Sequence, residues 1–283
     1  MSPNLSLRSL LSDSPLPPNE ARMLMAHVLE KHYQLPRSAL LSRDGMALDS
    51  EALKEWQVLE TKRSNGEPIA YLVGKRGFHN IELYVAPGVL IPRPETELLV
   101  EIGLHEITRL KKASATQATL LDLGTGSGAI ALAIAHAAPQ VLVTATDQSA
   151  EALEIAKRNA KELGLEERVE LIQGSWYEPL GRQTFDIILS NPPYIAKQDP
   201  HLKQGDLRFE PASALTDHET GLTCLEGIIS GAREHLYPNG FIAVEHGFDQ
   251  SEAVMSLMKA AGLREVKAYL DLAGHHRVAS GRK

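Results

Sequence analysis

Apolar residues at helical spacing dominate the first 75 residues of the chain. Asn19 is expected to cap one helix, and Ser50 a second helix that ends near Asn65 and Gly66. Short helices bury their apolar stripes only by packing on one another. The pattern therefore predicts a small helical domain over residues 1–75. The apolar positions that share a face are Leu24, Met25, Val28 and Leu29 in the first helix, and Leu53, Trp56 and Leu59 in the second.

The pattern changes over residues 76–92. Two short apolar pieces, 81–85 and 89–91, are separated by the turn residues Pro87 and Gly88. Alternation between turn residues is typical of strands. We expect a β-hairpin that connects the helical domain to the rest of the chain.

From residue 93 onward, strand patterns alternate with helix patterns. The segment 185–190 is nearly all apolar, as in a strand buried on both faces. The alternation predicts a mostly parallel sheet with helices on both faces, which would bind ligands at the carboxyl ends of its strands. This α/β domain is expected to span residues 93–283. The strands are expected at 119–123, 141–147, 169–172, 185–190 and 240–245, with two more strand-like pieces at the end of the chain, and the helices at 94–112, 129–137, 149–163 and up to about 261.

Composition narrows the class of protein. The chain has 283 residues, a net charge of −7 and one cysteine, Cys224, which excludes an internal disulfide and a thiolate zinc cluster. No apolar run reaches the roughly 18 residues that a membrane span needs, and residues 1–11 do not look like a signal peptide, so we expect a cytoplasmic protein. The acidic balance argues against direct nucleic-acid binding. His275 and His276 lack a third ligand at suitable spacing, so no metal is expected.

A glycine-rich loop, Asp122–Gly128, follows one predicted strand and opens a helix, and Asp147 ends the next strand. Glycines allow a ligand close to the backbone, and an acid at the end of the next strand can accept from ribose hydroxyls. The spacing G-x-G-x-G differs from the dinucleotide pattern G-x-G-x-x-G and favours S-adenosylmethionine; a dinucleotide or a purely structural turn are the alternatives. The expected cofactor residues are Gly124, Thr125, Gly126, Ser127, Gly128 and Asp147.

The tetrapeptide Asn191-Pro192-Pro193-Tyr194 directly follows the fourth predicted strand. Two prolines stiffen it and remove two backbone donors, which leaves a row of acceptors. Acceptors that hold both N–H groups of a planar amide or aromatic amine could point its nitrogen at a methyl donor, and Tyr194 could stack on it. We therefore expect Asn191 and Tyr194 to be catalytic and residues 191–194 to bind substrate. The alternative is a tight turn without function.

These motifs resemble those of Rossmann-like amino-group methyltransferases. The more specific resemblance is to the protein-(glutamine-N5) methyltransferases of peptide-chain release factors, the PrmC/HemK family, and it covers nearly the whole chain. It implies a Rossmann-like S-adenosylmethionine methyltransferase sheet with a small N-terminal helical domain joined by a β-hairpin. The further segments that carry it are Glu67–Leu72, Leu90–Glu97 and Val244–Gly247.

The resemblance also implies roles. Asp147 would bind the ribose, and Trp176 and Asn191 would also contact the cofactor. The substrate would be the glutamine of the Gly-Gly-Gln segment of class I release factors, recognised with help from the N-terminal domain. Many relatives carry an acid where this chain has Ser175.

Some residues and functions stay open. Arg93 and Glu95–Glu97 have two compatible roles. They either form ion pairs at the domain junction or contact the substrate or cofactor. Glu245, Arg208 and Glu210 are candidates for the neighbourhood of the site. The rival functions are an adenine methyltransferase of nucleic acid, a ribosomal-protein glutamine methyltransferase, and a non-catalytic cofactor-binding protein.

Overall fold

The computed structural model describes residues 6–113 and 117–283. The chain divides into two compact units, Met1–Lys75 and Arg76–Lys283.

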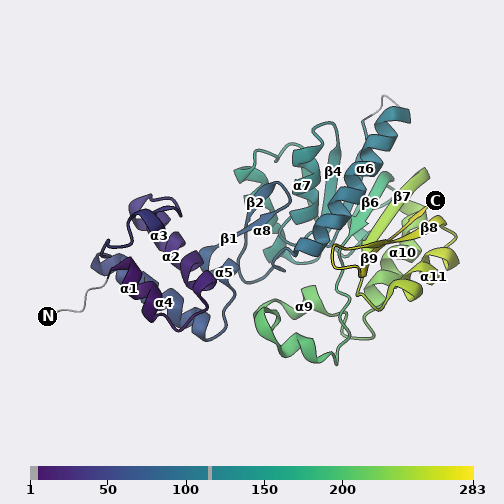
Figure 1. Cartoon of the computed structure of the whole chain (residues 1–283). Helices are drawn as coiled ribbons and strands as arrows, with labels where there is room; N and C mark the ends of the chain where they lie inside the picture. Colours follow the sequence, from purple (N-terminus) through teal and green to yellow (C-terminus); the bar gives the residue numbers. More distant parts are fainter. Residues whose placement is uncertain (1–5, 114–116) are drawn as a thin grey trace. The chain divides into compact units, whose positions relative to one another are not determined.

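The first unit is helical (Figure 1). Its largest helix starts at Pro18, whose fixed φ suits a first helical position, so the expectation that Asn19 caps this helix is wrong. Asp49 rather than Ser50 caps the next long helix, because its carboxylate accepts from the backbone N–H groups of Glu51 and Ala52. The helices are α1 (Leu7–Asp13), α2 (Pro18–Tyr33), α3 (Ala39–Ser42), α4 (Ser50–Ser64) and α5 (Ile69–Val73).

The core of this unit matches the predicted helical stripes. The four apolar residues singled out in α2 are all buried, as are Trp56 and Leu59 of α4. They form one hydrophobic cluster with Leu7 and Leu40. The unit thus has a core of its own.

A hairpin of β1 (Lys75–Phe78) and β2 (Ile81–Tyr84) follows. The second strand had been expected at 89–91, and this is wrong: the turn falls at His79, which has a φ of 51°, and the chain beyond β2 is irregular. Gly88, with a φ of 110°, lies in a turn, as expected from the sequence, but this turn follows the hairpin instead of closing it.

The main sheet confirms the predicted fold class. Over residues 117–283, it has seven strands in the order β5-β4-β3-β6-β7-β9-β8, of which the first five are parallel and β9 is antiparallel to both of its neighbours. The strands are β3 (Thr119–Leu123), β4 (Leu142–Asp147), β5 (Val169–Gln173), β6 (Phe185–Ser190), β7 (Leu236–Glu245), β8 (Arg264–Leu270) and β9 (His276–Arg282).

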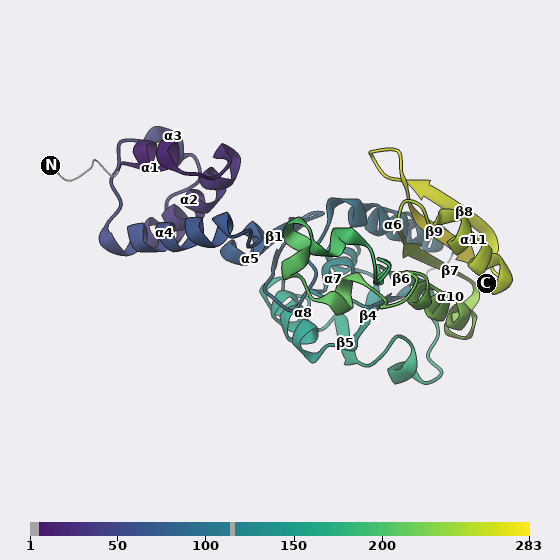
Figure 2. The same cartoon turned by 90° about the horizontal axis from the view of Figure 1, so that it is seen from below.

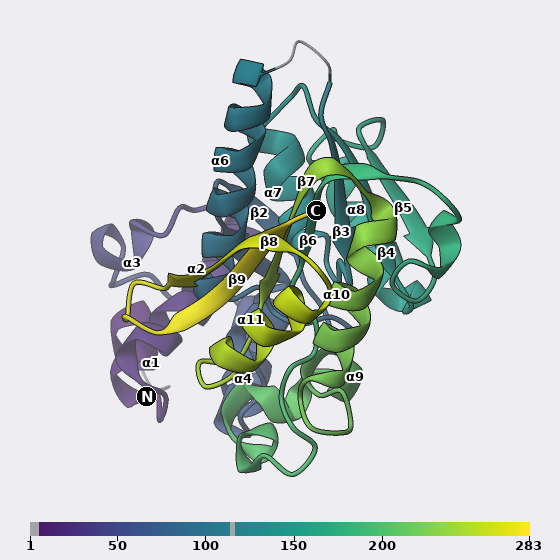
Figure 3. The ribbon, with the colours of Figure 1, turned by 90° about the vertical axis from the view of Figure 1, so that its right-hand side faces the viewer.

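Helices cover both faces of this sheet, and α6 and α10 lie on opposite sides of it (Figure 3). Alternate residues of each strand supply the two cores: Leu120 and Leu189 face α6 and α7, whereas Leu121 and Ile188 face α10 and α11. The helices are α6 (Glu97–Ala113), α7 (Ala129–Ala137), α8 (Ala150–Glu162), α9 (Ala212–Leu215), α10 (Thr223–His235) and α11 (Ser251–Ala260).

The chain order reverses at the centre of the sheet. Strand β3 has β4 on one side and β6 on the other, so the connections that leave β3 and β6 run to opposite sides. Such a point opens a crevice at the carboxyl ends of the strands. The segment 195–216, which includes α9, lies beyond this end of the sheet (Figures 1 and 2).

Candidate functional site

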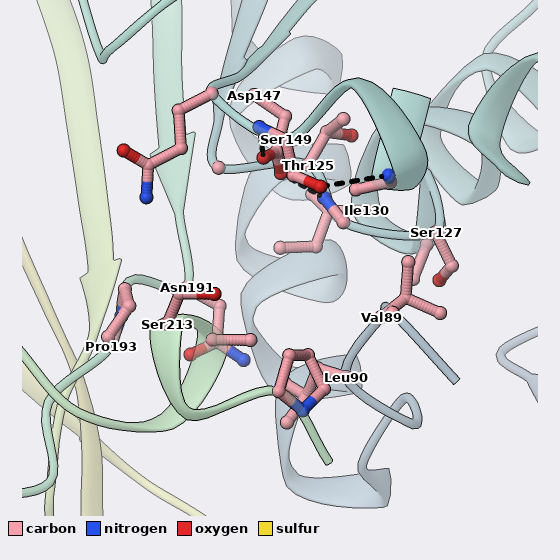
Figure 4. A pocket seen from close by; sticks show the side chains of 18 of the residues that line it. Val89, Leu90, Thr125, Ser127, Ile130, Asp147, Ser149, Asn191, Pro193 and Ser213 are labelled. Carbon is pink, nitrogen blue, oxygen red and sulfur yellow. Dashed lines mark hydrogen bonds between the residues drawn. The ribbon is translucent and has the colours of Figure 1, made fainter. Parts of the chain in front are cut away.

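A cavity of about 920 Å³, its opening to solvent included, lies at the carboxyl ends of β3, β4, β5 and β6. Figure 4 shows Asp147, Thr125 and Ser149 on one side of it, and Asn191, Pro193 and Ser213 on the other. The sequence-predicted residues that line the cavity are Gly124, Thr125, Gly126, Ser127, Asp147, Trp176, Asn191 and Pro193; Gly128, Pro192 and Tyr194 are not part of its lining.

The Asp147 carboxylate accepts hydrogen bonds from the glycine loop and from the start of the segment that leads into α8. One of its carboxylate oxygens accepts from the backbone N–H of Gly126 at 2.8 Å and the other from that of Ser149 at 2.9 Å. Burial raises the pKa of Asp147, and these two hydrogen bonds lower it. A carboxylate oxygen has two lone pairs, so both oxygens can still accept from a ligand's hydroxyls.

Gly124 and Trp176 meet at the floor of the cavity. Gly124 has a φ of 73°, and a Cβ there would lie 3.1 Å from Cζ3 of Trp176. A side chain at position 124 would therefore strain the backbone and push the indole out of place. The loop at Trp176 is held in turn because its carbonyl accepts from the Thr146 hydroxyl at 3.1 Å.

Asp122 supports the glycine loop from below. It is fully buried and accepts from the Thr125 hydroxyl at 2.7 Å and from the Ala131 N–H at 3.2 Å. Burial raises its pKa to about 7. It ties the loop to the start of α7.

Asn191 follows β6 directly and turns its side chain toward the short 3-10 helix Pro94–Thr96 that precedes α6. Its Nδ2 donates to the Thr96 hydroxyl at 3.0 Å, and Thr96 also lines the cavity. Pro192 is buried, whereas Pro193 faces the cavity. Thr96 was not singled out from the sequence, and only its place in the segment Leu90–Glu97 pointed to it.

Tyr194 lies on the other side of the loop. Its ring packs into the core between the sheet, α10 and α11, and its hydroxyl donates to Glu245 Oε1 at 3.0 Å. Its carbonyl accepts from Gln250 Nε2 at 2.9 Å. Burial, with the Glu245 charge beside it, raises the Tyr194 pKa well above its usual value. Because Tyr194 does not line the cavity, its stacking on substrate stays a prediction.

The segment after β6 forms a wall of the cavity through Pro211, Ser213 and Ala214, which the sequence did not single out. Glu210 anchors this wall: its carboxylate pairs with Arg93 and accepts from the Ile91 N–H at 3.0 Å.

The other residues left open by the sequence have different surroundings. Arg93 pairs within the second unit, and Glu97 accepts from the His79 N–H at 3.0 Å. The Arg208 guanidinium lies over the Phe209 ring.

The described residues hold no group of three or more His, Cys, Asp or Glu side chains that could hold a metal ion, and none of their helices is long and apolar enough to cross a membrane.

Comparison with known proteins decides the family. The model for the PrmC N-terminal domain matches residues 6–74, and that for the methyltransferase small domain matches residues 104–214. A release factor glutamine methyltransferase of Bordetella pertussis is 50% identical over 97% of this chain and 98% of its own length. The chain belongs to the release factor glutamine methyltransferase family. A relative with the same description from Xylella fastidiosa is 46% identical over 93% of this chain and 92% of its own.

Solved structures agree on the fold. A methyltransferase from Pyrococcus furiosus superposes with a TM-score of 0.53 at 19% identity, over 79% of this chain and 97% of its own. The catalytic domain of hMettl16 superposes with a TM-score of 0.55 at 15% identity, over 82% of this chain and 81% of its own. The fold is that of the Rossmann-like methyltransferases.

Membership makes the protein an S-adenosylmethionine-dependent methyltransferase, and the cavity fits this cofactor. It offers carboxylate acceptors at Asp147, a glycine floor and an indole at Trp176. These groups suit hydroxyls and a flat base. Ser175 lines the same cavity, and its hydroxyl can both donate and accept a hydrogen bond there.

Proposed function

We propose that this enzyme methylates the side-chain amide nitrogen of the glutamine in the Gly-Gly-Gln motif of class I peptide-chain release factors. The observation that carries the proposal is that Asn191 shares one cavity with Asp147 and the glycine loop. The names of relatives at 42–50% identity support the substrate. The N-terminal unit would contribute to recognition of the release factor.

The residues of the cavity divide into two groups. Asp147 would accept from the ribose, Trp176 would line the adenosine site, and the loop Gly124–Gly128 would lie along the cofactor backbone. Asn191 lies across the cavity from Asp147 (Figure 4). S-adenosylmethionine, when bound, supplies an electrophilic methyl group on its sulfonium.

An amide nitrogen is a poor nucleophile because its lone pair is delocalised into the carbonyl. Asn191 Oδ1 would accept one N–H of the glutamine amide, and a backbone carbonyl of the 191–193 segment the other. The Tyr194 carbonyl already accepts from Gln250, so the three preceding carbonyls are the preferred candidates. Such acceptors increase electron density on the nitrogen and fix its direction of attack, so catalysis comes from positioning and preorganised dipoles. The proton can leave to solvent after transfer.

The test is mass spectrometry of a release factor incubated with the enzyme and S-adenosylmethionine. We expect one added methyl on the Gly-Gly-Gln glutamine. Asn191→Ala should lower turnover by about a hundredfold or more while cofactor affinity stays near that of the wild type. Asp147→Ala is the matched variant, because it should instead weaken cofactor binding in calorimetry.

The rival substrates are outcomes of the same experiment. Transfer of labelled methyl to DNA or RNA but not to release factor would overturn the proposal. Methyl on a glutamine of a ribosomal protein alone would do the same. Turnover of Asn191→Ala near the wild-type rate would remove the role given to Asn191.

A further inference from the structure

Asn191 is the first member of a series of polar contacts that leads from the cavity into the core. Its Nδ2 donates to the Thr96 hydroxyl at 3.0 Å. The Tyr194 hydroxyl donates to Glu245 Oε1 at 3.0 Å, at the end of β7, and the Thr96 hydroxyl interacts with the same carboxyl and lowers its pKa. Thr96 is 4% exposed and Glu245 is 1% exposed, so water does not compete with these contacts.

The two ends of an asparagine amide have nearly the same shape and opposite chemistry. The oxygen only accepts hydrogen bonds, and the nitrogen only donates them. Methyl transfer to an amide needs the oxygen of Asn191 at the cavity, because the substrate nitrogen also presents donors. If the Asn191 amide were rotated by half a turn, its NH₂ group would face the N–H groups of the substrate, and two donors would oppose each other. The group that orients this amide is therefore as necessary as the amide itself.

We propose that Thr96 and Glu245 are positioning residues that hold the Asn191 amide with its oxygen toward the substrate; the inference rests on the function proposed above for Asn191. An ionised carboxylate only accepts, so the single proton of the Thr96 hydroxyl points to Glu245. The lone pairs of that hydroxyl then face Asn191, and only Nδ2 can meet them.

Tyr194 reinforces this polarity from the other side. Its hydroxyl gives its proton to Glu245 Oε1, so it uses the carboxylate as an acceptor, as Thr96 does. The fourth residue of the tetrapeptide thus also acts through Glu245 on the first. The loop Asn191–Tyr194 and the end of β7 work as one unit.

The ionisation of Glu245 controls the direction of these hydrogen bonds. Burial raises the pKa of Glu245 to about 7; the hydroxyls of Thr96 and Tyr194 and the charge of Arg277 lower it, and Glu95 raises it. Oε2 of Glu245 is buried, with no hydrogen-bond partner among the described residues. A protonated Glu245 carboxyl donates as well as accepts, so it no longer fixes the direction of the Thr96 proton, which can then turn to Asn191 and favour the reversed amide. Turnover should therefore fall as the pH drops through about 7.

The experiment compares Thr96→Val and Glu245→Gln with the wild type. Both variants keep the shape of the side chain. Each should lower kcat by about 10- to 100-fold, the usual effect of losing a group that orients a functional side chain, with cofactor affinity unchanged. Thr96→Ser keeps the hydroxyl and should restore turnover. The matched control is Thr108→Val, which removes an exposed hydroxyl from α6, the helix that directly follows Thr96, and should leave kcat unchanged.

Two further measurements separate positioning from a merely structural role. The decline of kcat below neutral pH should be present in the wild type and absent in Glu245→Gln. The double variant should be little slower than either single variant, because both act through Asn191. Melting curves and calorimetry with S-adenosylmethionine show whether each variant is folded.

The possible negative results distinguish failure of the positioning roles from failure of the proposed function. Wild-type kcat in folded Thr96→Val and Glu245→Gln, with Asn191→Ala inactive, would overturn the positioning roles and leave the proposed function standing. Thr96→Ser as slow as Thr96→Val would also overturn them, because the hydroxyl would then not be the operative group. An active Asn191→Ala would sink the proposed catalytic role first.

Discussion

At the scale of single residues, Glu245 links pH to stability in the direction opposite to its expected effect on turnover. Its pKa is about 7 in the folded protein against a usual 4.5. Between these pH values the folded protein binds the proton more tightly than the unfolded chain does, so stability falls as the pH rises. At about 1.4 kcal/mol per pKa unit, the loss is on the order of 3 kcal/mol.

Glu245→Gln should remove this dependence. We expect it to be more stable than the wild type in urea unfolding at pH 8, with the advantage lost near pH 5. Asp122, whose pKa is also raised to about 7, titrates in both proteins and cancels in the comparison. If the free energy of unfolding changed with pH in the same way in both proteins, the carboxyl responsible for the change would not be that of Glu245.

Single residues also mark how far the sequence predicts the site. Gly124, Asp147 and Asn191 each adjoin the end of a parallel strand, and the fold brings such ends together, so their common cavity followed from their positions. Thr96 is 95 positions from Asn191, and no local pattern relates the two. The Tyr194 ring packs, partly buried, against the core, a contact that periodicity does not reveal.

At the scale of elements, one buried amide is among the contacts that attach the second strand of the hairpin to α8 and the glycine loop. Asn159 of α8 accepts from the Tyr84 N–H at 2.7 Å and donates to the carbonyls of Tyr84 at 3.0 Å and Ser127 at 2.8 Å. The residue is 1% exposed, so these groups have no water to replace it. It joins β2 to the glycine loop.

Asn159→Ala should lower the free energy of unfolding by about 2–4 kcal/mol, because three buried polar groups lose their partner. Asn159→Asp should be worse, since a carboxylate would face two carbonyl oxygens. The measurement is urea unfolding, with Asn19→Ala as the control, because Asn19 is exposed on α2 and does not cap it. An Asp variant as stable as the wild type would mean that the amide does not link these elements.

Elements were predicted best where many residues share a pattern. The strands of the main sheet and the helices α7 and α8 lie where alternation and periodicity put them. Boundaries that depend on one residue were less secure: Asp49 rather than Ser50 caps α4, since both can accept and only the backbone conformation decides. The predicted position of the hairpin was wrong for the same reason, because the turn lies at His79, a residue without a strong turn preference.

At the scale of the whole molecule, the two units have separate cores and each contains one tryptophan. Trp56 is buried in the helical unit, and Trp176 lines the cavity of the second unit. The chain has two tryptophans in all, so Trp176→Phe and Trp56→Phe give proteins in which fluorescence reports on one unit alone.

We expect the two reporters to respond differently to S-adenosylmethionine. A ligand that binds only the folded second unit, at about 100 times its dissociation constant, stabilises that unit by about 2.7 kcal/mol. In Trp56→Phe, the Trp176 transition should therefore move to higher urea. In Trp176→Phe, at a concentration that saturates this variant, the Trp56 transition should stay where it is without cofactor. Wild-type calorimetry is the control, and should show two heat absorptions of which the cofactor moves one. If both tryptophans report one transition that shifts as a whole, the units unfold cooperatively, and binding at the cavity stabilises the helical unit as well.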